Sequence, residues 1–299
     1  MIAQMNNKSI RMLIFKLLRY SGLPFLFREV IQKQHVTILL FHAIPLESAD
    51  TAFKYLMKHY TIIGLNDFFN SCREKKPLPE KSLIITFDDG HRSNYDLLPL
   101  FKRYAIPVTI FLCSGIIDTN RHFWFSITHP DYSTEQLKKV PNREKLNILK
   151  EIGFEPEINY SHPQALSKDQ IREMSPFVNF QSHTVFHPCL PYCDDDEARQ
   201  EISMSKKMLE QEYSFMINAI AYPNGDYTER DIQFCIDAGY EFGLTVDYGF
   251  NTPSTDPFKL RRISVNDTGN MDELIVKSSG VWGFLKTNVL KIANIFGVV

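Results

Sequence analysis

The chain has 299 residues, of which 44% are hydrophobic and 23% are charged, a balance typical of a globular protein large enough for one α/β barrel or two smaller domains. Its formal net charge of −2 and isoelectric point near 6.5 provide no overall basic field for a phosphate backbone, so nucleic acid is not an expected partner. Five cysteines without zinc-finger pairing indicate reduced thiols rather than a disulfide scaffold, and we expect Cys189 and Cys193 to be structural.

Residues 1–34 are predicted to form a basic amphipathic N-terminal segment. They contain six basic residues and a single acidic residue, Glu29. Lys8, Lys16 and Arg19 fall largely opposite an apolar stripe at helical spacing. The stripe consists of Ile10, Leu13, Ile14, Leu17 and Leu18. Such a helix could lie on an anionic membrane surface or pack on the outside of the domain, and both alternatives stay open.

Residues 276–299 are predicted to form a C-terminal helix whose apolar stripe consists of Leu285, Val289, Ile292 and Phe296. Near the N-terminus, Arg11 and Lys16 interrupt the apolar run and no small-residue cleavage site follows, so no signal peptide is expected. No run approaches the length of a transmembrane helix. The expected location is the cytoplasm, and the two terminal helices suggest peripheral contact with the inner face of the membrane or with a glycolipid.

Between these ends, residues 35–275 alternate between strand-like runs and helical patterns. Seven strands are expected, at residues 36–42, 83–89, 108–113, 178–183, 219–223, 241–247 and 259–265. Alternation of strand and helix is typical of parallel strands joined by crossover helices, and seven or eight such units close into a barrel. The sequence therefore predicts an α/β barrel.

Residues 119–166 separate the third and fourth predicted strands by far more than one crossover requires. A helical stretch at 143–152 and the aromatic run 123–125 indicate that this insertion has structure of its own, and it is a candidate lid. Trp124 could stack on a sugar ring or belong to a small satellite core. Neither interpretation is favoured by the sequence.

Two adjacent carboxylates, Asp88 and Asp89, follow the apolar strand that begins at Leu83. A strand of aliphatic and β-branched residues is expected to be buried on both faces, so it delivers both acids to the C-terminal edge of the sheet, where active sites of α/β proteins collect. Adjacent residues leaving a strand point to different sides, so one acid could bind a metal while the other acts as a base. The alternative is a turn that Gly90 closes.

Two histidines, His183 and His187, follow the fourth predicted strand at a spacing of four. On a helical turn or a tight loop, both imidazoles can point at one ion, and a carboxylate completes the ligand set of hydrolytic zinc sites. The spacing alone is weak evidence, but both histidines and the acid pair are predicted at C-terminal strand ends, where they can converge.

Three motifs now resemble those of the polysaccharide deacetylases, the NodB-homology or carbohydrate esterase family 4 enzymes. They are Thr86-Phe87-Asp88-Asp89-Gly90, Ser182-His183-Thr184-Val185-Phe186-His187-Pro188 and Ala221-Tyr222-Pro223-Asn224-Gly225, and the resemblance covers about residues 36–270. It implies a deformed (β/α)7-type barrel and removal of an N-acyl group, usually acetyl, from an amino sugar.

The resemblance also implies roles for individual residues. Asp89, His183 and His187 would hold one divalent metal, usually zinc, and Asp88 would act as the catalytic base. Cobalt, nickel and iron suit the same ligands. A backbone N–H at Asn224, in the turn formed by Pro223 and Gly225, would help to hold the oxyanion, although a purely structural turn is the alternative.

Two positions depart from the family pattern. Many members have arginine at the position of Ala221, where it orients the base, and Arg262 is the candidate substitute here. The late Leu-x-x-His motif that supplies the catalytic acid would fall at Leu260 and lacks its histidine. His42, at the end of the first predicted strand, could fill this role, and His91 is a weaker candidate.

The sequence thus predicts a metal-dependent hydrolase that removes an N-acyl group from an amino sugar in a polysaccharide or glycolipid precursor. Two alternatives remain open. One is a hydrolase of another small amide, such as a formamido sugar, because the motifs specify the chemistry better than the substrate. The other is a sugar-binding protein without catalysis, which the missing acid and arginine would favour.

Overall fold

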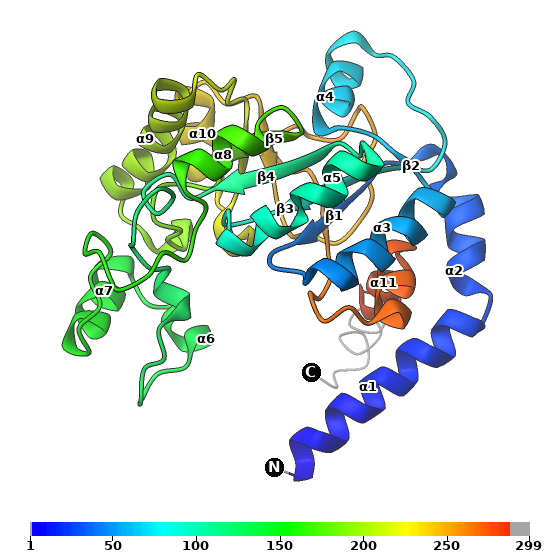
Figure 1. Cartoon of the computed structure of the whole chain (residues 1–299), viewed down its shortest axis with the longest axis horizontal. Coiled ribbons are helices and arrows are strands. Elements are labelled where there is room, and N and C mark those ends of the chain that lie inside the picture. The colour runs from blue at the N-terminus through cyan, green and yellow to red at the C-terminus, as the bar shows by residue number, and fades with distance from the viewer. Residues whose placement is uncertain (1, 288–299) are drawn as a thin grey trace. The chain divides into compact units, whose positions relative to one another are not determined.

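The computed structural model describes residues 2–287, with side chains from residue 9 onward (Figure 1). The predicted stripe residues Val289, Ile292 and Phe296 therefore lie outside the described residues. The chain divides into two compact units. The first contains Met1–Ile85, Asp247–Thr255 and Arg261–Val299, and the second contains Thr86–Val246 and Asp256–Leu260. Strand β3 (Ser82–Phe87) begins in the first unit and ends in the second.

In the first unit, parallel strands form the core. Strand β1 (Thr37–Phe41) lies between β3 and β8 (Ile263–Ser264), and β2 (Thr61–Ile62) also pairs with β3. Every residue of β1 is buried, as its apolar sequence predicts. Strand β2 was not predicted, because two residues are too few to show a period of alternation.

The helices of the first unit lie in the N-terminal segment, between its strands and after β8. They are α1 (Ile2–Tyr20), α2 (Leu23–Leu26), the π-helix η1 (Phe27–Ile31), the 3₁₀ turn η2 (Gln32–Gln34), α3 (Leu46–His59), α4 (Leu65–Glu74) and α11 (Met271–Ser278). Residues 281–287 are also helical. Asn270 caps α11 by accepting hydrogen bonds from the backbone N–H groups of Asp272 and Glu273, which satisfies donors that the helix leaves unpaired.

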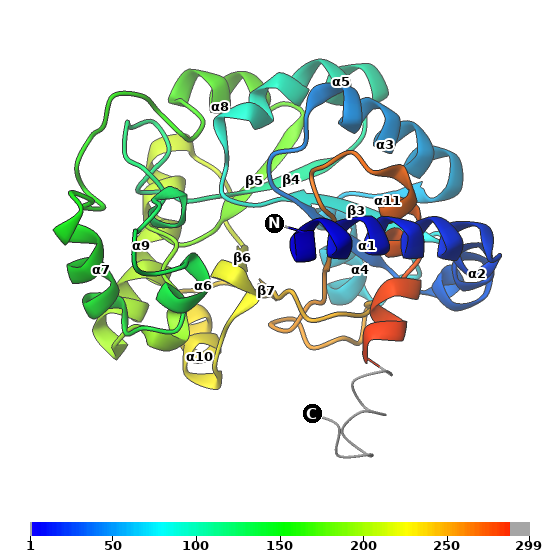
Figure 2. The same ribbon diagram turned by 90° about the horizontal axis from the view of Figure 1, so that it is seen from below.

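Helix α1 packs beside α11 (Figure 2). Of its predicted apolar stripe, Leu18 alone takes part in this packing among the described residues. Phe15 is 1% exposed and joins a core with Phe27, Val276 and Val281. Arg11 and Arg19 form ion pairs with Glu273 at 3.0 Å and Asp272 at 2.6 Å. Arg11 and Arg19 therefore face the protein, whereas Lys16 and most of the apolar stripe, Ile10, Leu13, Ile14 and Leu17, remain exposed. Within residues 2–287, no helix is both long and hydrophobic enough to span a bilayer.

In the second unit, parallel strands follow the order β7-β6-β5-β4-β3. They are β4 (Val108–Leu112), β5 (Val178–Ser182), β6 (Ala219–Ala221) and β7 (Phe242–Leu244), together with the end of β3. All residues of β4 are buried, and β5 continues in the same register, with Leu112 opposite Ser182. This parallel alignment brings the C-terminal ends of successive strands to one edge of the sheet.

Three of the helices of the second unit, α8 (Lys168–Met174), α9 (Asp195–Tyr213) and α10 (Glu229–Asp237), begin at side-chain caps. The same unit contains the 3₁₀ turn η3 (Arg92–Leu97) and α5 (Leu98–Tyr104). Ser167 and Thr228 form capping boxes with Gln170 and Asp231, and Asp194 caps α9. Figure 1 shows α9 and α10 packed next to each other.

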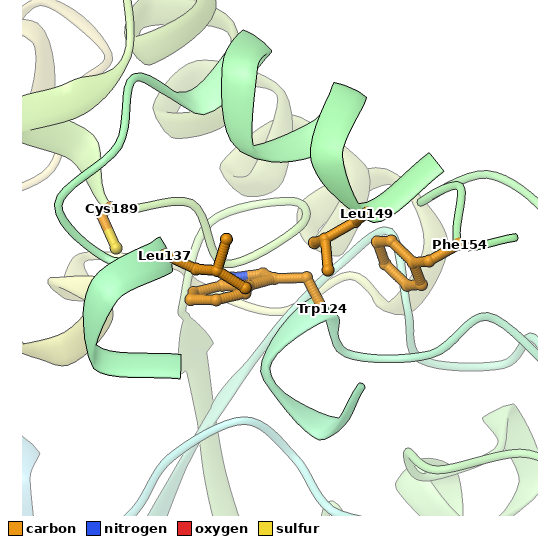
Figure 3. Packing of buried hydrophobic residues seen from close by; sticks show 5 residues of the cluster. All are labelled: Trp124, Leu137, Leu149, Phe154 and Cys189. Carbon is orange, nitrogen blue, oxygen red and sulfur yellow. The ribbon is translucent and has the colours of Figure 1, made fainter. Parts of the chain in front are cut away.

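The insertion has a small core of its own, as one interpretation of the sequence predicts. It contains the 3₁₀ turn η4 (Trp124–Ser126), α6 (Thr134–Leu137) and α7 (Asn142–Glu151). The buried side chains of this satellite core are Trp124, Leu137, Leu149, Phe154 and Cys189 (Figure 3). Because Cys189 follows β5, the satellite core attaches the insertion to the loop beyond that strand.

Candidate metal centre

Three predicted ligands from two strand ends lie together in the second unit. Asp89 follows β3, whereas His183 and His187 follow β5, and all three side chains are buried. Their potential ligand atoms lie within 4.8 Å of one another. Among the described residues, this is the one cluster of three or more His, Cys, Asp or Glu side chains that could hold a metal ion. The parallel sheet therefore brings together residues far apart in the sequence.

The two carboxylates approach the same histidine. Nε2 of His183 lies 3.5 Å from Asp89 Oδ1 and 3.7 Å from Asp88 Oδ2, and Nε2 of His187 lies 3.4 Å from Asp89 Oδ1. Both acids thus approach His183, and Asp89 also approaches His187. Asp89 has left the strand conformation and lies in the left-handed region, with φ of 70°.

The imidazole of His183 is held in one tautomer. Its Nδ1 lies 2.8 Å from the carbonyl oxygen of Ala221. Because a carbonyl only accepts, Nδ1 carries a proton and donates it, so in the neutral ring Nε2 is the nitrogen with the free lone pair, and it faces Asp89. Metal-binding histidines are commonly oriented by such a bond from the other ring nitrogen.

The two histidines are joined by a tight loop rather than by a helical turn. Thr184 and His187 have φ of 65° and 59°. The carboxylate of Glu201, on α9, accepts hydrogen bonds from the backbone N–H groups of Val185 at 2.8 Å and Phe186 at 2.9 Å. Trp124 Nε1 donates to the carbonyl oxygen of His187 at 2.8 Å. These contacts hold the loop in a conformation that its own residues disfavour.

The electrostatics of the cluster suit a cation. Burial alone would raise the pKa of Asp89, but the hydrogen bond from His91 and the nearby imidazoles of His187 and His183 lower it below its ordinary value. Burial lowers the pKa of His187 to about 3, so this imidazole is neutral at pH 7. Asp89 is thus an anion and His187 is neutral, which are the protonation states that metal ligands require.

The unpaired atoms of the cluster also fit a metal ion. Asp89 Oδ1 and His187 Nδ1 are buried and have no hydrogen-bond partner. A buried carboxylate oxygen without a partner costs free energy, and a divalent cation between this oxygen and the imidazoles would offset that cost. One carboxylate and two imidazoles are a ligand set that zinc accepts while keeping a further position open.

His91 and Glu201 contact the cluster in ways that the sequence did not predict. His91 Nε2 lies 2.9 Å from Asp89 Oδ2, and its ring is 5.0 Å from that of Phe123. In the sequence, the only signal for the contact of His91 with Asp89 was the position of His91 directly after Gly90. Glu201 lies on a helix that follows the histidine loop, and no motif marks it.

The turn at Pro223–Gly225 is formed as expected. Asn224 has φ of 57°, and its Nδ2 donates to Cys189 Sγ at 3.2 Å. Burial raises the pKa of the thiols of Cys189 and Cys193, so both stay protonated, and the five cysteines are free. The structural interpretation of these thiols holds, and the oxyanion role of the Asn224 backbone stays a prediction.

Trp124 does not offer an open stacking surface. The indole is 3% exposed and is buried in the satellite core, which agrees with the second interpretation of this residue rather than with contact to a sugar. His42 and Arg262 belong to the first unit. His42 donates its backbone N–H to Asp267 at 3.2 Å, and Arg262 is buried. Their proposed roles in acid catalysis and base support stay predictions.

Comparison with solved structures supports the fold. The chain resembles IcaB from Ammonifex degensii with a TM-score of 0.62 and 17% identity, covering 83% of this chain and 98% of that one. It resembles the deacetylase PplD of Streptococcus pyogenes, solved in complex with acetate, with a TM-score of 0.57 and 21% identity, covering 81% and 99%. The predicted (β/α)7-type barrel is confirmed.

Comparison of sequences supports the family. The chain is 26% identical over 196 residues to the protein YxkH of Bacillus subtilis, covering 65% of this chain and 54% of that protein. It is 27% identical over 211 residues to a poly-β-1,6-N-acetyl-D-glucosamine N-deacetylase of Staphylococcus epidermidis, covering 67% and 60%. It therefore spans only a little over half the length of these relatives. The family model described as polysaccharide deacetylase matches residues 75–243, more than half of the chain and all of the candidate metal centre, and the chain belongs to this family.

Proposed function

We propose that the protein is a metal-dependent hydrolase that removes an N-acyl group, most often acetyl, from an amino sugar in a polysaccharide or glycolipid precursor. One observation carries the proposal: the buried, unpaired Oδ1 of Asp89 faces two histidines while a second carboxylate, Asp88, stands 3.7 Å from one of them. Membership of the polysaccharide deacetylases and the name of the staphylococcal relative support the substrate class.

Asp89, His183 and His187 would hold the metal, for which zinc is the proposed identity. The chemistry that zinc supplies when bound is polarisation of the amide carbonyl and a lowered pKa for water at the open position. Asp88, which is not needed as a ligand, would accept the proton of the attacking water. The hydrogen bond from Nδ1 of His183 to the carbonyl oxygen of Ala221 leaves Nε2 for the metal, and coordination there would keep this nitrogen from taking up the proton.

Three further residues complete the proposed reaction. The backbone N–H of Asn224, in its left-handed conformation, would stabilise the negative oxygen that forms on the amide carbonyl. His42 would protonate the leaving amine, and Arg262 would support the base. The assignment of His42 rests on its position at the end of the first predicted strand, and that of Arg262 on its position in the last one, as a substitute for the arginine that is missing at Ala221.

The test is release of acetate from N-acetylglucosamine oligomers by the zinc-loaded protein. Asp88→Asn should retain the metal and lower kcat by roughly 100-fold to 10,000-fold, because it removes the proton acceptor but not a ligand. Equal turnover by this variant would contradict the role of Asp88. Binding of metal and sugar without turnover of acetyl, formyl or longer acyl substrates would favour the non-catalytic alternative.

We also propose that the protein works in the cytoplasm and contacts the anionic inner face of the membrane through α1, α2 and η1. Large apolar side chains are exposed on these elements, including Leu13 at 56%, Leu17 at 64% and Phe25 at 63%. Lys16 is also exposed on α1 and can attract anionic headgroups.

Vesicle co-sedimentation tests this contact. The double variant Leu13→Ser and Leu17→Ser should bind phosphatidylglycerol vesicles more weakly than the wild type, because it removes apolar area available for insertion. Met216→Ser is the matched control, since Met216 is 81% exposed in the second unit. Unchanged binding of the double variant would rule out this surface.

A further inference from the structure

We propose that a cavity beside the histidine loop binds a saccharide unit that carries a free ammonium group, next to the unit that is deacylated. The cavity has a volume of about 310 Å³ and lies wholly in the second unit. This volume is at the lower end of the range of roughly 300–1,000 Å³ that is typical of small-molecule sites. The inference deepens the proposed function and rests on it for the identity of the ligand.

Four carboxylates line the cavity: Glu155, Glu157, Glu197 and Glu201. Glu155 already forms an ion pair with Lys150 at 3.4 Å, and Glu201 accepts backbone hydrogen bonds. Glu157 is exposed to solvent, and Glu197, on α9, lines the cavity. An excess of negative charge in a concave site favours a cationic ligand.

Unpaired buried atoms point independently to a ligand that donates hydrogen bonds. Asn142 is 6% exposed and lines the cavity, and its Nδ2 donates to Glu197 Oε1 at 2.6 Å. Asn142 Oδ1 and Glu197 Oε2 are buried and have no partner. Both atoms accept hydrogen bonds only, so an ammonium group or hydroxyl groups would satisfy them.

A buried cation beside the cavity, Lys145, does not fill this role. Lys145 is 1% exposed, and its Nζ lies 4.1 Å from the centre of the Trp124 ring. Trp124 itself forms one wall of the cavity. Burial lowers the pKa of Lys145, which weakens its ability to neutralise the carboxylates. The four acids also do not converge as a metal cluster, so a larger organic cation fits better than a metal ion.

The walls of the cavity connect it to the candidate metal centre. Phe186 and Pro188 line the cavity and flank the ligand His187, and Trp124, also in the wall, donates to the carbonyl oxygen of His187. Aromatic and proline side chains offer apolar surface to the C–H face of a sugar ring, while the carboxylates bind its polar edge. A unit in the cavity would therefore belong to the same saccharide chain as the unit at the metal centre.

Binding of glucosamine oligomers, followed by calorimetry in Asp88→Asn protein, tests the proposal. These fully deacetylated oligomers should bind at least several-fold more tightly than N-acetylglucosamine oligomers of equal length. Glu197→Gln should weaken their binding by roughly 10-fold, the effect expected for one hydrogen bond to a charged group. Glu151→Gln, which changes an exposed acid on α7 outside the cavity, should leave the affinity unchanged.

A second variant keeps the proposal testable if Glu197→Gln fails to fold. Glu157→Gln alters an exposed rim position and should weaken the same binding, most strongly at low salt. A fluorescence change of Trp124 on binding, measured with Trp282→Phe so that one tryptophan remains, would locate the ligand. Equal affinity for both oligomers, or no loss in both Glu197→Gln and Glu157→Gln, would overturn the proposal.

The two proposals fail in different ways. Acetate release without selective binding of glucosamine oligomers would contradict the proposed ammonium site and support the proposed deacylase function. Selective, Glu197-dependent binding without turnover of any acyl substrate would contradict the proposed deacylase function and support the ammonium site.

Discussion

The two oxygens of Asp89 have different surroundings, and this difference defines the candidate metal centre at the scale of single residues. Oδ2 is 2.9 Å from His91 Nε2, whereas Oδ1 faces His183 and His187 and is buried without a hydrogen-bond partner. A carboxylate that is oriented by one oxygen and binds metal with the other is typical of ligands supported by neighbouring groups.

Metal content should therefore depend on three residues and not on the proposed base. Asp89→Ala, His183→Ala and His187→Ala should each lose most of the bound metal, because each removes one of only three protein ligands. Asp88→Asn should keep it. Elemental analysis after gel filtration measures both outcomes, and full occupancy in all three alanine variants would refute the ligand assignment.

Glu201 should make stability depend on pH. Burial raises the pKa of Glu201 from its ordinary value to about 7, so between pH 4.5 and 7 the folded protein holds a proton that the unfolded chain releases. Its contribution to stability is complete below this window and is lost as the pH rises through it, by up to about 3 kcal/mol.

Glu201→Gln should flatten this part of the profile, and the glutamine oxygen can still accept from the histidine loop. Urea unfolding of wild type and variant at pH 5 and pH 8 gives the comparison, because contributions from other groups, including His187, cancel in the difference. An identical fall in stability for both proteins would show that Glu201 does not titrate in this range.

At the scale of elements, the turn after β6 depends on a glycine. Gly225 has φ of 79°, and a Cβ there would lie 2.6 Å from the backbone nitrogen of Val246. Gly225→Ala should destabilise the protein by about 1–3 kcal/mol, because neither the backbone conformation nor the contact is compatible with a side chain.

Thermal unfolding of Gly225→Ala measures this loss, and Gly153→Ala separates the two causes. Gly153 also has a positive φ, of 85°, but a Cβ there meets nothing within 4 Å. The cost at Gly153 should be the smaller of the two. If both substitutions cost the same, the contact with Val246 contributes nothing.

At the scale of the whole molecule, the bound metal should add to the stability of the folded state. An ion at 100 times its dissociation constant adds about 2.7 kcal/mol if it binds only the folded chain. For a chain of this size, zinc should raise Tm by roughly 5–10 °C, and a chelator should reverse the change. Asp89→Ala should show no shift with zinc, and an equal shift in this variant would mean that the metal binds elsewhere.

The sequence by itself determined the parallel α/β fold and the main residues of the candidate site. Runs such as Val108–Leu112 are apolar throughout because both faces of a parallel strand are covered, and this local pattern is visible without the fold. Since catalytic groups of such sheets collect at C-terminal strand ends, Asp89 and His183 could be matched across a long stretch of sequence.

Only the tertiary structure decided the rest, because it depends on contacts between segments that carry no local pattern. Asp89 adopts a left-handed conformation and both acids approach His183, and the contact of Glu201 with the histidine loop joins two separate elements. The periodicity of α1 predicted an apolar stripe but not its direction. Phe15 and the partners of Arg11 and Arg19 on α11 decided that the side with Phe15 packs and that most of the stripe does not, since burial depends on what a helix meets.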